Sequence, residues 1–387
     1  MSMMQNRKVS VAVVGMGGYG ETYVNAVLDH SEDYGMECIG MVDIHPESCK
    51  RLEEVQEKGI PVYPDLEALY QAGVPELVFM ATPIYLHRKQ ACFALEQGSN
   101  VLCEKPAAGC MKDVEIMAET AKRCNRFLAI GFQRSFDDTI LAAKADVLAG
   151  KYGKPLKYKL VTVGGRDQVY YSRHWAGKLK IGEEYVCDSI ANNAAAHGLN
   201  NLLFMAGETM HTAAYPECVE AECYRGNQIE NFDTITLRGK TENGVEIYFA
   251  ASHCVKESVP RAEEYLFEKG RIVDEGADGF NGYLENGEKI SYGCMNTGTD
   301  NKIICAVKAV RGEDTIYSDI VAAGAHSKLI QMVQDSVTIR EFGDKVQLLN
   351  LVDKKGRDRW TNVAEGIEDA LAECYEKELL LSEVNYF

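Results

Sequence analysis

Residues 9–20 read VSVAVVGMGGYG, six mostly apolar residues followed by the pattern G-x-G-x-x-G. The apolar run predicts a buried strand, and the residues that follow predict a helix. In this setting the first glycine permits a tight turn, the second lets the backbone approach a pyrophosphate, and the third allows close helix–strand packing. Free N–H groups at the start of the helix favour an anion. An ordinary glycine turn is the alternative, but the stretch predicts a dinucleotide site, whose expected contacts are Gly15, Gly17, Gly18, Tyr19 and Gly20.

The sequence around this stretch alternates short apolar runs with helical patterns. We predict strands over 9–14, 38–43, 61–63, 77–81, 100–103 and 127–132, and helices over 21–30, 47–58, 66–72, 86–97 and 111–124. Continuous apolar strands that alternate with helices are typical of a parallel, doubly wound sheet with both faces covered. The first third of the chain is therefore predicted to be an α/β Rossmann domain.

The pattern changes after residue 132. We predict helices over 137–149, 192–205, 318–335 and 361–380, and strands over 156–163, 219–224, 234–237, 245–253, 265–267 and 271–273. These strands alternate polar and apolar residues, as in a largely antiparallel open sheet. We therefore expect a Rossmann domain over 1–132, an α+β domain for substrate binding and oligomerisation over 133–345, and a C-terminal helical extension over 346–387. Since no Pro/Gly/Ser-rich linker separates the first two, we expect packed domains with a cleft.

Composition narrows the classes of partner. The 387 residues carry 41 basic and 58 acidic side chains, a net charge of −17, which disfavours binding to nucleic acid or an anionic membrane. No apolar stretch reaches the length of a membrane span. The 13 cysteines form no C-x-x-C pair, so we expect reduced thiols and a cytoplasmic protein. The histidines lack metal-ligand spacing, so we expect no metal.

Asp43 ends the second predicted strand, 23 residues after Gly20. A carboxylate at this position can accept hydrogen bonds from the ribose hydroxyls of the adenosine, and it repels a 2′-phosphate. The sequence therefore favours NAD over NADP. His45, Lys50 and Arg51 lie nearby, so NADP stays an alternative.

Two further strand ends carry polar or reactive residues. Ligands of open α/β sheets lie beyond the carboxyl ends of the strands. Thr82 and Pro83 follow the fourth strand and are expected to cover the ribose and nicotinamide side of the cofactor, with His87 as a second contact or a locally bonded helix histidine. Glu104 and Lys105 follow the next strand. Burial beside a carboxylate can tune such a lysine for proton transfer, although a solvated surface pair is the alternative.

The order of these motifs, closed by Gly131-Phe132-Gln133-Arg134, resembles the glucose–fructose oxidoreductase/inositol dehydrogenase (Gfo/Idh/MocA) family. The resemblance covers residues 9–134 and the region around 188–207, and the segment beyond about 345 looks like an addition. It implies a pyridine-nucleotide-dependent oxidoreductase acting on sugars or cyclitols. Lys105 then corresponds to the lysine of the family's E-K-P motif.

The same family carries Asp-x-Gly-x-His on a helix after the Rossmann half, followed three residues later by Asp. The matching residues here are Asn193, His197 and Asn200, so only the histidine is retained. A spacing of four predicts that Asn193 and His197 share one helix face. Asp188 is a candidate for the missing carboxylate, and Asn192 and Asn193 are candidates for binding polyol hydroxyls. His197 as a core histidine and Asn193 as a structural amide are the alternatives.

The stretch 166–175 offers a second substrate surface. It contains Arg166, Tyr171 and Trp175, with Tyr170, Arg173 and His174 between them. Aromatic rings match the apolar C–H faces of a sugar, and Arg and Tyr match its hydroxyls. A surface loop or an oligomer contact is the alternative.

Together these residues predict an NAD-dependent dehydrogenase of a small-molecule sugar, glycoside or cyclitol, with 3-oxidation of a glucoside as the favoured reaction. Lys105 and His197 are the expected proton-transfer pair, in either order. A redox-assisted glycosidase or lyase that recycles its NAD, and a non-catalytic dinucleotide-binding regulator, are the alternatives. An open sheet with one helix-covered face also predicts a homodimer or homotetramer.

Overall fold

The computed structural model describes residues 7–295, 298–352 and 355–387. The chain forms two compact units, one of Met1–Phe136 with Thr297–Gly324 and one of Asp137–Asn296 with Ala325–Phe387. The division expected from the sequence places 298–324 in the second domain, whereas in the structure these residues pack in the first unit.

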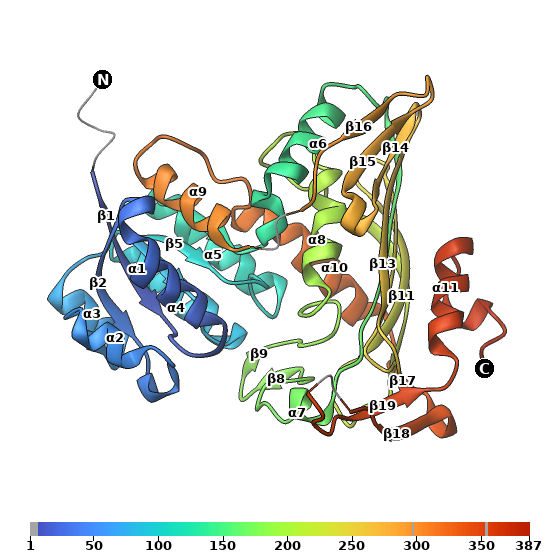
Figure 1. Ribbon diagram of the computed structural model, residues 1–387, viewed down its shortest axis with the longest axis horizontal. Helices are drawn as coiled ribbons and strands as arrows, with labels where there is room; N and C mark the ends of the chain where they lie inside the picture. The colour runs from blue at the N-terminus through green and yellow to red at the C-terminus, as the bar shows by residue number, and fades with distance from the viewer. Residues whose placement is uncertain (1–6, 296–297, 353–354) are drawn as a thin grey trace. The chain divides into compact units, whose positions relative to one another are not determined.

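The first unit is built on a six-stranded parallel sheet with the order β3-β2-β1-β4-β5-β6, so the predicted doubly wound fold is confirmed (Figure 1). This is the order of a dinucleotide-binding sheet whose strand order reverses between β1 and β4. The strands are β1 (Val9–Val14), β2 (Met36–Val42), β3 (Val62–Tyr63), β4 (Leu77–Met80), β5 (Asn100–Cys103) and β6 (Leu128–Ile130).

Helices cover both faces of this sheet, which is why its strands are apolar throughout. They are α1 (Glu21–Tyr34), α2 (Leu52–Glu57), α3 (Leu66–Ala72), α4 (Ile84–Glu96), α5 (Met111–Cys124) and α9 (Asp300–Val310). Helix α9 is not among the helices predicted from the sequence. Its buried Ile303, Ala306 and Val307 recur at helical spacing and join the same apolar core as β1 and α1. The chain that follows α9 lies beside β6, where the Ile130 N–H donates to the Ser318 carbonyl at 2.9 Å.

The second unit is built on a nine-stranded mixed sheet with the order β16-β15-β14-β13-β7-β12-β11-β10-β17. Only the β7–β12 and β10–β17 pairs are parallel. The strands are β7 (Pro155–Val163), β10 (Pro216–Arg225), β11 (Thr234–Thr241), β12 (Glu246–Ser252), β13 (Val259–Phe267), β14 (Gly270–Asp274), β15 (Phe280–Leu284), β16 (Lys289–Ser291) and β17 (Arg340–Glu341). The predicted α+β fold with a largely antiparallel sheet is confirmed.

Helices lie against both faces of this second sheet. Helix α8 (Ala196–Met205) contacts β7 from one side, and α11 (Ile367–Lys377) contacts β7 and β12 from the other, as Figure 1 shows. The buried Val161 and Val163 pack in one apolar cluster with Ile367 and Leu371. The premise that only one face is helix-covered is therefore wrong, because the C-terminal helix covers part of the second face. The remaining helices of this unit are α6 (Asp138–Leu148), α7 (Gln168–Tyr171) and α10 (Ile320–Ser336), which begins in the first unit.

Three helix predictions need correction. The predicted helix over 47–58 begins only at Leu52, after a 3₁₀ turn over Pro46–Ser48. The predicted helix over 192–205 begins only at Ala196, and residues 191–195 form turns. The predicted helix over 361–380 divides into strand β19 (Trp360–Ala364) and α11. Strand β19 pairs with β18 (Val346–Asn350), so the C-terminal segment contains a hairpin as well as a helix. A second small hairpin joins β8 (Lys180–Ile181) to β9 (Glu184–Tyr185).

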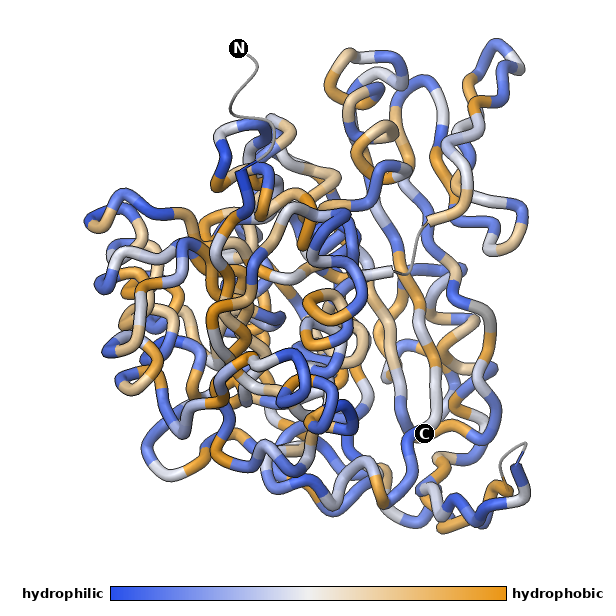
Figure 2. The backbone as a smooth tube through the Cα atoms, turned by 60° about the vertical axis from the view of Figure 1, so that its left-hand side comes forward, coloured by the Kyte–Doolittle hydropathy of each residue, from blue (hydrophilic) through white to orange (hydrophobic). Residues whose placement is uncertain are grey.

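The hydropathy of the backbone follows this architecture. Hydrophobic stretches lie mostly inside the units, along strands and inward helix faces, and hydrophilic stretches lie mostly on the outer turns (Figure 2). Within the part of the chain that the structure describes, no helix is both long and apolar enough to cross a membrane.

Candidate functional site

The glycine-rich stretch forms a tight turn at the carboxyl end of β1. Gly15 has a φ of +87°, which favours glycine, and a Cβ there would lie 2.7 Å from the Ala81 carbonyl oxygen. A Cβ on Gly20 would lie only 2.0 Å from the Gly15 carbonyl oxygen. Gly18–Gly20 form a short 3₁₀ turn that leads directly into α1. The turn thus brings bare backbone to the start of the helix, as a pyrophosphate site requires.

Asp43 follows β2 and is fixed against this turn. Its Oδ2 accepts a hydrogen bond from the Met16 N–H at 2.6 Å, and its Oδ1 accepts one from the His45 N–H at 2.8 Å. Each carboxylate oxygen has a second lone pair, so the group can still accept from two ribose hydroxyls. The donors and the acceptor present therefore fit the adenosine and pyrophosphate of a dinucleotide.

The basic residues near Asp43 are already engaged by carboxylates. Lys50 pairs with Glu21 at 2.7 Å, and Arg51 pairs with Asp29 and Glu54, each at 2.6 Å. A side chain held in this way offers less positive charge to a 2′-phosphate. This pairing favours NAD over NADP.

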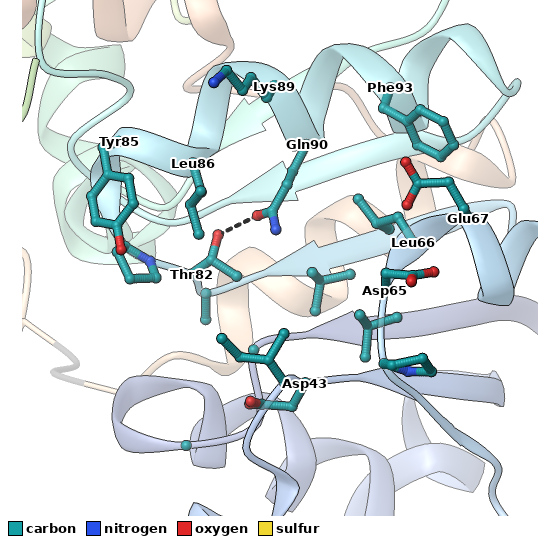
Figure 3. Close-up of a pocket in the computed structure, with 18 residues that line it drawn as sticks. Asp43, Asp65, Leu66, Glu67, Thr82, Tyr85, Leu86, Lys89, Gln90 and Phe93 are labelled. Atoms are coloured by element: carbon teal, nitrogen blue, oxygen red, sulfur yellow. Dashed lines mark hydrogen bonds between the residues drawn. The ribbon is translucent and has the colours of Figure 1, made fainter. Parts of the chain in front are cut away.

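A pocket of about 440 Å³ opens beside Asp43, in the first unit. Figure 3 shows Asp43 on one side of it and α4 on the other, with Thr82 donating a 2.6 Å hydrogen bond to Gln90. Five of the predicted cofactor residues line this pocket, namely Gly15, Gly17, Asp43, Thr82 and Pro83.

Sequence reasoning missed the apolar part of the same pocket. Leu66 lies at the start of α3, and Leu86 and Phe93 lie on α4. Apolar side chains can pack against the faces of a flat adenine ring, so apolar residues soon after the third and fourth strands were the available signal. Tyr85 and Lys89 also line the pocket.

His87 is buried, with a relative exposure of 1%. Its Nε2 lies 2.8 Å from the Thr82 carbonyl oxygen, and its Nδ1 lies 3.1 Å from the Pro106 carbonyl oxygen. Burial lowers the pKa of His87, although the carbonyl groups oppose that shift. The imidazole thus bridges the turns after β4 and β5, which positions both.

Glu104 and Lys105 differ in their surroundings although they are neighbours. Glu104 is buried and accepts a 2.6 Å hydrogen bond from the Tyr23 hydroxyl, while Lys105 is half-buried. The Lys105 N–H donates to Glu104 at 3.3 Å. The glutamate is therefore placed to position the lysine backbone.

In the second unit, the side chains of Asp188 and Asn193 are joined by a hydrogen bond. The Asn193 amide donates to Asp188 Oδ1 at 2.9 Å, and the Gly177 N–H donates to Asp188 Oδ2 at 2.6 Å. Asn193 also donates to the Tyr170 hydroxyl at 3.3 Å. Because Asn193 precedes α8, the argument that it shares a helix face with His197 is wrong, but a carboxylate does lie beside it.

Tyr171 adds to this cluster of polar side chains. Its hydroxyl lies 2.8 Å from Nδ1 of the buried His253. Burial, followed by the charges of Arg166 and Arg173, lowers the pKa of His253 to about 3, so this histidine is neutral at physiological pH. Arg173 stacks on the rings of Tyr170 and Trp175, with centroid distances of 3.8 and 4.5 Å.

The remaining predicted residues of this unit differ in burial. Asn192 is buried and donates to the Cys187 carbonyl at 3.1 Å, while its Oδ1 has no hydrogen-bond partner within the described part of the chain. His197 lies in the first turn of α8 and is half-buried, as are Arg166 and Trp175. The two expected proton-transfer residues lie in different units, Lys105 in the first and His197 in the second. Among the described residues, no group of three or more His, Cys, Asp or Glu side chains could hold a metal ion.

The C-terminal hairpin supports the stretch that carries Tyr171. Asp167 caps α7 by accepting the Tyr170 N–H at 2.9 Å, and its other oxygen accepts from Arg359 at 2.7 Å. Nothing in the spacing of the sequence pointed to this pair, because its members are 192 residues apart.

Comparison with known proteins agrees with this site. Residues 9–132 match the GFO_IDH_MocA model, described as an oxidoreductase family with an NAD-binding Rossmann fold. The fold and the glycine turn define an NAD-binding Rossmann unit. Residues 9–132 thus match the Gfo/Idh/MocA family, and the resemblance drawn from the motifs is confirmed over this part of the chain.

Curated relatives share part of the chain. Inositol 2-dehydrogenase of Pseudomonas fluorescens is 27% identical over 204 residues, which are 52% of this chain and 55% of the relative. The 2,7-anhydro-N-acetylneuraminate hydratase of Mediterraneibacter gnavus is 31% identical over 162 residues, 42% of this chain and 41% of the relative. The chain thus spans about half the length of the curated relatives that it matches.

Solved structures share the fold over most of the chain. The WlbA dehydrogenase of Bordetella pertussis, in complex with NADH and UDP-GlcNAcA, has a TM-score of 0.69 at 20% identity and covers 85% of this chain and 96% of its own. The UDP-N-acetylglucosamine 3-dehydrogenase GnnA of Acidithiobacillus ferrooxidans has a TM-score of 0.69 at 18% identity and covers 85% and 98%. At these identities the likeness concerns the fold alone.

Proposed function

We propose that the protein is an NAD-dependent dehydrogenase that transfers a hydride between a hydroxyl-bearing carbon of a sugar, glycoside or cyclitol and the nicotinamide. The observation that carries the proposal is the Asp43 carboxylate, held by the Met16 N–H beside the glycine turn of an NAD-binding Rossmann unit. Such a carboxylate recognises the ribose hydroxyls and disfavours a 2′-phosphate.

The chain's own residues would bind, orient and move a proton. NAD supplies the hydride acceptor when it is bound. The glycine turn and Asp43 would hold its adenosine diphosphate half, and the backbone at Thr82 and Pro83 would cover the nicotinamide half. Lys105 and His197 are our proposed proton-transfer residues, one polarising the substrate oxygen and the other taking its proton.

The second unit would select the substrate. Asp188, Asn192, Asn193 and Tyr171 offer donors and acceptors for several hydroxyls, and Trp175 and Tyr170 offer faces for C–H groups. The relatives support a polyol: one is named inositol 2-dehydrogenase and a fold neighbour is named a UDP-N-acetylglucosamine 3-dehydrogenase. We favour 3-oxidation of a glucoside, because this polar and aromatic set suits a glycoside better than a small acid.

A second candidate is an enzyme whose NAD is reduced and reoxidised within one turnover. One relative is named a hydratase, and adding water to a substrate is not a net oxidation. A glycosidase or lyase of this kind would use the same Rossmann unit.

One experiment separates the two. The protein with NAD⁺ is given a panel of monosaccharides, glycosides and cyclitols, and both NADH and products are measured. A dehydrogenase yields NADH in proportion to product, whereas the second candidate yields product without NADH. Product formation that does not depend on NAD would contradict both. Light scattering would test a related proposal, that the protein is a homodimer or homotetramer.

A further inference from the structure

A buried cluster in the first unit joins three segments that are distant in the sequence. The ammonium group of Lys302, on α9, forms an ion pair with Glu104, at the end of β5. It also donates to the Tyr19 hydroxyl, in the glycine-rich turn, at 3.2 Å. Tyr23, on α1, donates to the same Glu104 oxygen at 2.6 Å.

The cluster is shielded from solvent on one side and open on the other. The side chain of Lys302 is 0% exposed and that of Glu104 is 8% exposed, whereas Tyr19 is 43% exposed. The Lys302 ammonium lies 5.0 Å from the Tyr19 ring centroid and 5.3 Å from that of Tyr23. Lys302 therefore links a buried carboxylate to an accessible residue of the dinucleotide turn.

The sheet topology gives the cluster its position relative to a dinucleotide. In this strand order the dinucleotide crosses the point between β1 and β4. Asp43, after β2, marks the adenosine half, and the turns after β4 and β5 lie on the nicotinamide side. Glu104 and Lys105 form the turn after β5, so Lys302 contacts the glycine turn and the nicotinamide-side turn together.

The buried charges of Lys302 and Glu104 stabilise the fold only as a pair. Removing one partner of a buried ion pair leaves an uncompensated charge, which costs more than removing both. Burial lowers the pKa of Lys302, but the Glu104 carboxylate and the Tyr19 hydroxyl raise it by more, so its pKa lies above the ordinary value. Lys302 is thus charged at physiological pH, and its ammonium can hold both partners.

We propose that Lys302 is a positioning residue for the nicotinamide half of NAD, acting through Tyr19 of the glycine turn and through Glu104 beside Lys105. The inference rests on the proposed function, since it takes NAD as the dinucleotide. It places a cofactor-positioning group on α9, outside residues 9–132 that match the family model.

The test compares two probes, NADH and AMP, whose binding is measured by calorimetry. The main variant is the double substitution Lys302→Met with Glu104→Gln, which leaves no unpaired buried charge. We expect NADH to bind roughly tenfold more weakly, within the range of coupling between linked groups. AMP occupies only the adenosine half, so its affinity should stay within about twofold, because no contact to Asp43 changes.

Two further variants complete the design. Lys308→Met, at an exposed position on the same helix, is the matched control and should bind both probes like the wild type. Tyr19→Phe removes only the hydroxyl that Lys302 contacts. It should lower the affinity for NADH but not the affinity for AMP. It keeps the test decisive if the double variant does not fold.

The outcomes are distinct. Unchanged NADH affinity in the folded double variant, or in Tyr19→Phe, would overturn the role of Lys302. Equal losses for NADH and AMP would also overturn it, because they indicate a general effect on the fold. If the wild type binds AMP but not NADH, the proposed function itself fails.

Discussion

The carboxylate of Asp43 and the backbone N–H of Met16 are joined by a 2.6 Å hydrogen bond, which connects the end of β2 to the glycine-rich turn after β1. This bond fixes the carboxylate beside the backbone where a dinucleotide is expected. It also means that the orientation of Asp43 is set before a ligand binds.

The first prediction concerns cofactor preference. The wild type should bind NAD more tightly than NADP, because the 2′-phosphate would lie against the Asp43 carboxylate. Asp43→Ala should narrow this preference by roughly tenfold, since one repulsive charge is removed. Titration of both dinucleotides by calorimetry measures the ratio.

Lys50→Met is the matched control for this prediction. Lys50 is paired with Glu21, so its removal should leave the preference within about twofold of the wild type. A wild type that binds NADP more tightly than NAD would show that the interpretation of Asp43 is wrong.

The second prediction concerns the chemical step. Lys105→Ala and His197→Ala should each lower kcat by ~10²–10⁴-fold if they are proton-transfer residues. The affinity for NADH should stay close to that of the wild type in His197→Ala, because His197 is not among the expected cofactor contacts. Near-normal turnover in either variant would remove that residue from the mechanism.

The third prediction follows from the 2.9 Å bond between Asn193 and Asp188. Asn193→Asp would place two carboxylates in contact, so one of them should have a folded-state pKa above its unfolded value. The folded state then binds more protons than the unfolded state, so stability is kept at low pH and lost as pH rises through the unfolded pKa of about 4 and beyond. Melting temperatures of Asn193→Asp and Asn193→Ala between pH 4 and pH 8 should diverge with rising pH. Parallel curves would show that Asp188 does not face position 193.

The fourth prediction concerns Lys144 on α6, whose side chain is buried over the Phe204 ring and donates to the Thr212 carbonyl at 2.7 Å. Burial lowers the pKa of Lys144 from 10.5 to about 7. Between these values the unfolded state binds the extra proton, so stability falls as pH decreases from about 10 to about 7 and then levels off.

Lys144→Met should therefore remove part of that pH dependence and raise stability most near pH 7. Denaturant unfolding at pH 7, 8 and 9 measures the effect, with Lys328→Met on the exposed side of α10 as the control. An equal change at all three pH values would mean that Lys144 titrates normally in the fold.

The first unit was largely predictable because its signals are local. Each strand is a continuous apolar run bounded by a turn, and strands β1 and β5 and helices α3 and α5 have the bounds that the sequence indicated. The pocket residues Gly15, Asp43 and Thr82 follow strands, so topology alone brings them together.

Other features depend on contacts that spacing does not encode. Helix α9 joins the first unit although 160 residues of the second unit separate it from Phe136. In the sequence, Lys302 is a polar residue among apolar ones. Its ion-pair partner Glu104 is known only from the fold. The predicted helix over 192–205 includes Asn193, but the backbone forms a turn there, and the Asn193 side chain donates a hydrogen bond to Asp188.

The proposed dehydrogenase activity is tested most directly by measuring NADH formation from NAD⁺ with a panel of sugars, glycosides and cyclitols, for the wild type and for Lys105→Ala. We expect that at least one glycoside or cyclitol gives NADH in equal amount to its oxidised product, and that Lys105→Ala loses this activity while it remains folded. Substrate conversion without NADH, or NADH formation that Lys105→Ala leaves unchanged, would contradict it.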